Sequence, residues 1–115
     1  MLYIYNMKSN SGDDLIFKGL ADSRRRRMLD LLKRGPRTTG EICDRFKGTL
    51  DRCTVMQHLG VLERAGLIIV RRDGRNRWNH LNAAPFKEIY DRWISSYADE
   101  AVGLLARLKR NLEGS

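Results

Sequence analysis

The 115-residue sequence lacks the features that mark several large classes of protein. No apolar run approaches the roughly 18 residues that a membrane-spanning helix requires, so no membrane partner is expected. The first residues also lack the charged start, long apolar stretch and small-residue cleavage site of a secretory signal. We therefore expect a cytoplasmic protein whose length suits one domain.

Cysteine and histidine are scarce, with two of each. Cys43 and Cys53 are too few for a disulfide scaffold and form no C-x-x-C pair of the kind that binds zinc. Together with His58 and His80 they are a poor ligand set for zinc or arsenic. No serine or cysteine stands beside a positioned base, and the carboxylates are scattered over the expected helices. We therefore expect no metal site, no cofactor and no enzymatic activity.

Positive charge is abundant and unevenly distributed. The sequence has 22 Lys and Arg against 14 Asp and Glu, a net charge of +8. Residues 23–80 contain 15 of the basic and 6 of the acidic residues, so the whole excess lies in the middle of the chain. Such a stretch is typical of a polyanion binder, because each phosphate contact releases a counterion. An arginine-rich surface can also serve solubility alone, so composition leaves both interpretations open.

Hydrophobic periodicity predicts a mainly α fold with one small β-hairpin. Capping residues and glycines set the expected ends of the helices, and Asp73-Gly74 is a strong hairpin signal. The expected elements are a tail over residues 1–12, a helix over 13–20, a second from Asp22 or Ser23 to Gly35, a third from Thr38 or Thr39 to Gly48, a fourth from Asp51 to Gly66, a hairpin over 67–81 and a long last helix over 85–112.

The fourth helix has an apolar and a polar face. Val55, Leu59 and Leu62 recur at i, i+4 and i+7 and must face the core. A helix with a small or polar outward face fits the major groove, where Gln can bond adenine and Arg can bond guanine. The residues expected to contact DNA from this helix are Arg52, Cys53, Thr54, Met56 and Gln57.

Arginines surround the tip of the expected hairpin, where they suit a narrow minor groove. We expect these wing residues, Arg71, Arg72, Arg75 and Arg77, to contact DNA as well. For the run from Arg24 to Arg27 two interpretations remain open, namely phosphate contacts, or solvated charges and dimer contacts. Two short helices followed by such a hairpin make a winged helix-turn-helix, with residues 38–66 as the helix-turn-helix and residues 67–81 as the wing of a single domain over 13–115.

The chain resembles the ArsR/SmtB-type winged-helix repressors over about residues 20–86. The resemblance is carried by the stretches LADSRRRRMLDLLKRGPRTTGEICDRF, LDRCTVMQHLGVLERAGLI and RRDGRNRWNHLNAAPF. It implies that the TVMQHL helix is the recognition helix and that the first and last helices form a homodimer. A dimer explains the last helix, which at about 1.5 Å per residue is too long for this small domain to cover. The residues expected at the dimer interface are Leu15, Ile16, Tyr90, Trp93, Tyr97, Leu104 and Leu108.

The metal-sensing patterns of that family are absent from this sequence. Its thiolate pattern would require cysteines near Thr38 and Gly40, and the last helix contains no histidine. Three kinds of control therefore remain, of which constitutive repression is expected first. The others are an unidentified small apolar effector between the dimer helices and oxidation of Cys53, whose thiol lies in the first turn of a helix beside Arg52.

These features together predict a sequence-specific DNA-binding transcriptional regulator. We expect a homodimeric repressor that binds double-stranded DNA at a palindromic promoter site. The alternative is a winged-helix module that binds protein or RNA without sequence-specific DNA binding.

Overall fold

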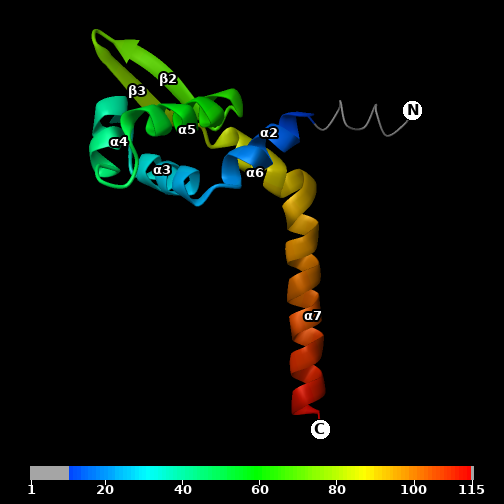
Figure 1. Ribbon diagram of the computed structural model, residues 1–115. Coiled ribbons are helices and arrows are strands. Elements are labelled where there is room, and N and C mark those ends of the chain that lie inside the picture. Colours follow the sequence, from blue (N-terminus) through cyan, green and yellow to red (C-terminus); the bar gives the residue numbers. More distant parts are fainter. Residues whose placement is uncertain (1–10, 115) are drawn as a thin grey trace. The chain divides into compact units, whose positions relative to one another are not determined.

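The computed structural model describes residues 11–114, in two units that meet in sequence between Pro85 and Phe86. The first unit contains short helices and a small sheet, and the second is helical (Figure 1). In chain order the elements are α2 (Ser11–Leu20), α3 (Ser23–Lys33), β1 (Arg37–Thr38), α4 (Thr39–Arg45), α5 (Arg52–Arg64), β2 (Ile68–Asp73), β3 (Asn76–Leu81), α6 (Ala84–Ile89), a π-helical turn (Tyr90–Ile94) and α7 (Ser95–Glu113).

Side-chain caps set where α3, α4 and α5 begin. Of the two candidates for α3, Asp22 is the cap, and its Oδ1 accepts from the Arg24 N–H at 2.8 Å. Thr38 caps α4 in a reciprocal capping box with Glu41. Asp51 caps α5 by accepting from the Thr54 N–H at 2.7 Å. The predicted starts of these helices are therefore confirmed, because capping depends on residues a few positions apart.

The apolar faces predicted for α3 and α5 form the core of the first unit. Cys43, which the periodicity of α4 predicts to face inward, is only half-buried. The buried side chains of α3, α4 and α5 include Met28, Leu29, Leu31, Leu32, Ile42, Val55, Leu59 and Leu62, and Phe46, Leu67 and Ile68 complete the core beside them.

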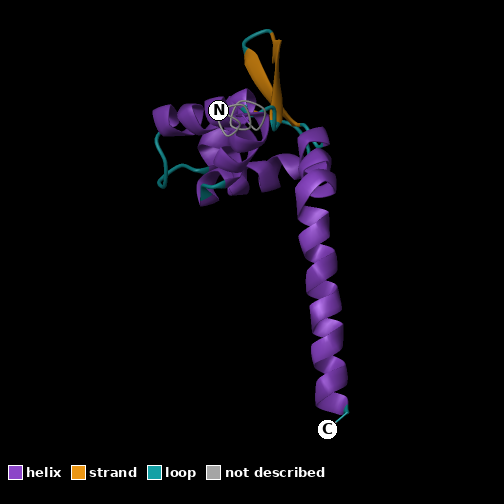
Figure 2. Cartoon of the chain, turned by 90° about the vertical axis from the view of Figure 1, so that its right-hand side faces the viewer, coloured by secondary structure: helices purple, strands orange, loops and turns teal. Residues whose placement is uncertain are grey.

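The sheet has three antiparallel strands in the order β1-β3-β2. The hairpin β2–β3 is the predicted wing and projects beyond the helices of the first unit (Figure 2). Its turn contains Gly74 at a φ of +61°, a left-handed conformation that glycine adopts without steric cost. The strand β1 pairs Arg37 with Asn79, and its two residues are too few for the alternation that predicts a strand.

The expected N-terminal tail over residues 1–12 falls almost entirely outside the described residues. Its last two positions, Ser11 and Gly12, already belong to α2. The predicted start of this helix at Asp13 is therefore two residues late.

The second unit is not the uniform α-helix predicted over 85–112. Between α6 and α7 the N–H of Ser95 donates to the carbonyl of Tyr90, five residues earlier, which is the π-helical pattern. No residue of α7 is buried. Its large apolar side chains are therefore exposed, Leu104 and Leu108 by about half.

Candidate nucleic-acid interface

The polar face of α5 points outward from the first unit. Arg52, Cys53 and Gln57 are exposed, and Met56 is 37 % exposed. Thr54 is half-buried, and its N–H is bonded to Asp51. The opposite face holds the fully buried core residues, so packing fixes which side of α5 meets solvent.

Three of the four predicted wing arginines are free to meet a partner. Arg71, Arg72 and Arg75 are exposed and lie along β2 and at the hairpin turn. We call these three, together with Arg52, Cys53, Met56 and Gln57 of α5, the recognition surface. It combines donors that can reach base edges with guanidinium groups that can contact phosphates.

Arg77, the fourth predicted wing residue, has a partner within the chain. Its Nη2 forms an ion pair with Glu63 Oε1 of α5 at 3.0 Å, and its side chain is only 28 % exposed. Its Nε is buried. Arg77 therefore joins the wing to α5, because its side chain points toward that helix and not toward the solvent around the hairpin tip.

A buried asparagine that the sequence analysis missed connects the wing to α4. Asn79 is fully buried in β3, and its Nδ2 donates to Thr39 Oγ1 at 3.1 Å and to the Arg37 carbonyl at 3.2 Å. The Thr39 hydroxyl donates in turn to the Arg77 carbonyl. The sequence signal for Asn79 was its position in the middle of a predicted strand, because asparagine is uncommon in strands.

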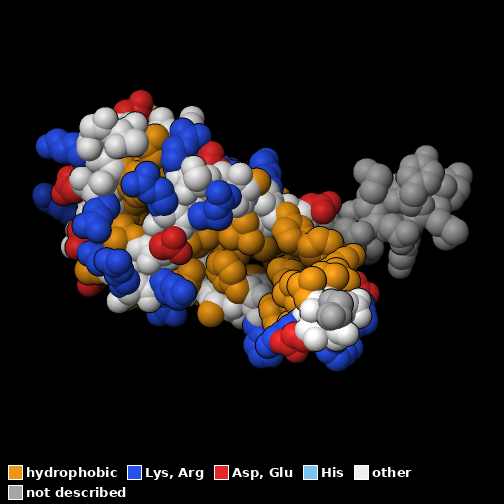
Figure 3. All heavy atoms as spheres, turned by 90° about the horizontal axis from the view of Figure 1, so that it is seen from below, with side chains coloured by type: hydrophobic (Ala, Val, Ile, Leu, Met, Phe, Trp, Pro, Cys, Tyr) orange, Lys and Arg blue, Asp and Glu red, His pale blue; other side chains and the backbone are white. Residues whose placement is uncertain are grey.

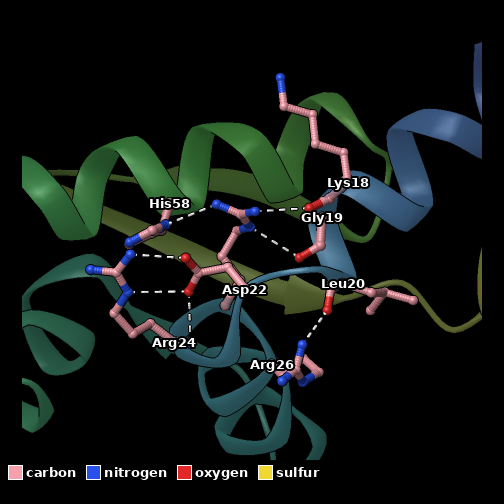
Figure 4. Close-up of polar contacts among 8 residues, drawn as sticks. Lys18, Gly19, Leu20, Asp22, Arg24, Arg26 and His58 are labelled. Atoms are coloured by element: carbon pink, nitrogen blue, oxygen red, sulfur yellow. Dashed lines mark hydrogen bonds and ion pairs between the residues drawn. The ribbon is translucent and has the colours of Figure 1, made fainter.

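The arginine run at the start of α3 is engaged within the chain. Arg24 pairs with Asp22 at 2.8 Å, and this hydrogen-bonded guanidinium holds the pKa of Asp22 far below its usual range. Arg26 donates to the carbonyl of Leu20 at 2.6 Å, and Arg27 lies 5.6 Å from the ring centroid of Phe46. These contacts favour structural roles over the phosphate contacts that remained open for the run, and Figure 4 shows those of Arg24 and Arg26.

Arg25, in the same run, contacts a buried histidine of α5. Its Nη1 lies 3.1 Å from His58 Nδ1. His58 is 7 % exposed, and burial lowers the pKa of its imidazole. His58 is thus part of the core-side packing of α5.

Neither a metal cluster nor a membrane span is present in the described part of the chain. Across residues 11–114, no three His, Cys, Asp or Glu side chains converge at a site that could hold a metal. None of the helices in that range is long and apolar enough to cross a bilayer. Both cysteines are free thiols, with Cys53 exposed.

The residues predicted at a dimer interface differ in exposure. Ile16 is only 6 % exposed, so it belongs to the core and offers almost no surface to a partner, whereas Leu15 on the next helical position is exposed. Figure 3 looks along α7 and shows hydrophobic side chains on one side and charged ones on the other. The predicted residues of the second unit, Tyr90, Trp93, Tyr97, Leu104 and Leu108, are all exposed.

Comparisons with known proteins agree on one family. Residues 20–71 match a family described as a helix-turn-helix domain. The uncharacterised HTH-type transcriptional regulator YuzN of Bacillus subtilis is 38% identical over 90 residues, 74% of this chain and 98% of that protein. The crystal structure of an ArsR family transcriptional regulator is 30% identical, with a TM-score of 0.69 over 77% of this chain and 89% of its own. The chain belongs to the ArsR/SmtB-type family of winged helix-turn-helix transcriptional regulators.

Two further known proteins are similar to this ArsR-family regulator. The transcriptional repressor SdpR of Bacillus subtilis is 29% identical over 85 residues, 74% of this chain and 91% of SdpR. A homodimeric winged helix-turn-helix DNA-binding domain of Mycobacterium bovis is 24% identical, with a TM-score of 0.64 over 84% of this chain and 87% of its own, and shows the shared fold. The fold is that of a winged helix-turn-helix protein, with β2–β3 as the wing.

Proposed function

We propose that this ArsR-family regulator is a homodimeric repressor that binds specific double-stranded DNA sites. The observation that carries the proposal is the two-faced recognition helix. Val55 is fully buried on its inner face, while Arg52 and Gln57 are exposed on the outer face. This arrangement leaves base-bonding side chains with no competing role in the core.

The wing extends the same surface with positive charge. Arg71, Arg72 and Arg75 have no carboxylate partner within 4 Å among the described residues, so their charges are available to phosphates. We expect the recognition helix to lie in the major groove and the wing arginines to follow the backbone or the adjacent minor groove.

The exposed apolar side of α7 supports a homodimer. Leu104 and Leu108 are each about half exposed, and Tyr97 is 56 % exposed. A stable obligate interface is apolar and buries more than roughly 2,000 Å² in total. Two recognition helices in successive major grooves would then require half-sites about 34–36 Å apart, which implies a palindromic site.

Repression is the expected consequence of occupying a promoter. SdpR, a relative over most of this chain, is itself a transcriptional repressor. With no metal cluster in residues 11–114, we propose that the amount of protein sets the level of repression.

The proposal is tested by selecting preferred sequences from a random duplex library and titrating the best duplex at two salt concentrations. We expect one preferred palindromic site. For each tenfold rise in salt, the logarithm of the binding constant should fall by about 0.9 for every phosphate that the protein contacts. An absence of sequence preference, or tighter binding to RNA or to a protein, would favour the alternative of an interaction module.

A further inference from the structure

A polar cluster lies where α2, α3 and the recognition helix meet. Arg25 of α3 donates from Nη2 to the Lys18 carbonyl at 2.8 Å and from Nε to the Gly19 carbonyl at 3.0 Å. Both carbonyls belong to the last turn of α2, and that of Lys18 also accepts from the Ala21 N–H at 3.2 Å. The remaining Nη1 lies 3.1 Å from Nδ1 of His58 (Figure 4). One guanidinium therefore joins the end of α2 to the recognition helix.

The contact works with only one protonation state of the imidazole. A guanidinium has donors and no acceptor, so Nδ1 of His58 must carry no proton to accept from Arg25. The proton of the neutral ring then lies on Nε2, which is buried with no hydrogen-bond partner in the described part of the chain. A protonated ring would place N–H against N–H, with two cations 3.1 Å apart.

The surroundings of His58 also favour the neutral ring. Burial is the main cause that lowers the pKa of His58, and the charges of Arg24 and Arg25 lower it further. The carboxylate of Asp22 opposes them, but it already pairs with Arg24. The helix α2 contributes backbone carbonyls to the cluster, and the ammonium group of Lys18 points away from it (Figure 4).

We propose that Arg25 is a positioning residue for the recognition helix and that its contact with neutral His58 makes operator binding sensitive to acid. Protonation of His58 separates the imidazole from Arg25 and so removes this polar link between the recognition helix and the end of α2. The inference rests on the proposed function, because it concerns how that function's DNA-reading element is held.

The direction of the pH effect follows from linkage. Since the packed state holds the pKa of His58 below the unfolded value of 6.5, the stabilising contribution is fully present above that value. It is lost as the pH falls below 6.5 toward the pKa of the packed state. Each pH unit between the two values corresponds to about a tenfold change in the equilibrium between anchored and released helix.

The experiment measures operator affinity and melting temperature from pH 8 to pH 5.5 at constant ionic strength. We expect wild-type affinity to fall by up to about tenfold, with the fall confined to the range below pH 6.5. His58→Gln supplies an amide oxygen that accepts from Arg25 and does not titrate, so its affinity at pH 8 should be near that of wild type and should not change with pH. Arg25→Ala should bind more weakly at pH 8 and also lose the pH dependence.

Two matched variants serve as controls. His80→Gln removes the only other histidine, and Arg26→Ala removes a cap on the Leu20 carbonyl without touching the recognition helix. Both should keep the wild-type pH profile. An unchanged pH dependence in His58→Gln, or none in the wild type, would overturn the proposal.

Melting curves separate this inference from the proposed function. If no duplex is preferred even at pH 8, the proposed function fails, and the melting temperature still reports on the contact. A wild-type melting temperature that falls below pH 6.5 while that of His58→Gln does not would support the Arg25–His58 contact. Identical profiles would refute it independently of DNA.

Discussion

At the scale of single residues, the recognition surface contains two kinds of side chain. Gln57 lies on the recognition helix and offers an amide that pairs with adenine in two hydrogen bonds. Arg75 lies at the hairpin turn and is exposed, where a guanidinium meets phosphates of any sequence. Base discrimination and general affinity should therefore respond to different substitutions.

We expect Gln57→Ala to cost about 1–3 kcal/mol on the best operator and to relax the preference at one base position. Arg75→Ala should weaken binding to all duplexes similarly and reduce the salt slope by about one phosphate contact. The measurement is a titration of each variant on the operator and on single-base variants of it. The opposite pattern would show that the wing, and not the helix, selects the base.

Gly19 is a second residue whose size matters. A Cβ at this position would lie 2.9 Å from Leu67 Cδ1 and 3.6 Å from the Ala65 Cβ, so α2 approaches the end of the recognition helix closely. We expect Gly19→Ala to lower the free energy of unfolding by about 1 kcal/mol, because overpacking outweighs the gain in helix propensity. Gly12→Ala is the control, since nothing lies within 4 Å of its Cβ. It should be neutral or slightly stabilising in denaturant melts.

At the scale of elements, the features that depend on nearby residues could be predicted from the sequence. The structure contains the caps at Thr38 and Asp51 and the buried face of α5 that begins at Val55. Each of these features was predicted from a local sequence pattern. Contacts between distant segments could not be predicted, such as Arg77 with Glu63 or the strand β1. The π-helical turn also escaped prediction, because apolar residues on both sides of it follow the spacing of one continuous α-helix.

The caps make the helices of the first unit sensitive to strong acid. The Thr54 N–H lowers the pKa of Asp51, and the Thr38 N–H lowers the pKa of Glu41. The stabilisation that these two carboxylates give the helices is therefore fully present above the ordinary pKa of a carboxyl group. It is lost as the pH falls through the lowered pKa values.

We accordingly expect the wild-type melting temperature to decline again below a pH of about 4. Asp51→Asn should decline less steeply, because asparagine caps equally well without titrating. A decline as steep as in the wild type would show that the cap of α5 contributes nothing to acid sensitivity.

At the scale of the whole molecule, charge and apolar surface are divided between the two units. Residues 23–80 have nine more basic than acidic residues, whereas residues 86–115 have five of each. An interface built on α7 would thus form without net repulsion between the chains. DNA binding and self-association should therefore respond differently to salt.

We expect Leu104→Glu combined with Leu108→Glu to yield a monomer in sedimentation experiments, because two carboxylates would be buried in an apolar interface. Ala106→Glu is the control, since helical periodicity places it on the opposite side of α7. The wild-type dimer should persist in high salt while operator affinity falls. A dimer that survives both glutamates would place the interface elsewhere.

Effector control is tested by measuring operator binding with zinc, arsenite, a chelator and peroxide in parallel. We expect none of them to release the operator, in keeping with constitutive repression. A tenfold release by zinc or arsenite, about 1.4 kcal/mol of coupling, would reveal a metal site. Release by peroxide that Cys53→Ser abolishes would instead identify a thiol switch.

The π-helical turn sets the rotational phase of α7. An α-helix turns about 100° per residue, so the extra residue within Tyr90–Ile94 offsets every later side chain by that angle from an uninterrupted helix. Deleting one residue there would restore an ordinary turn and leave α6 and α7 in their present phase. Inserting one residue after Ser96 would rotate Leu104 and Leu108 away with nothing to absorb the change. Chain length can therefore vary at this turn while the apolar side of α7 keeps its direction.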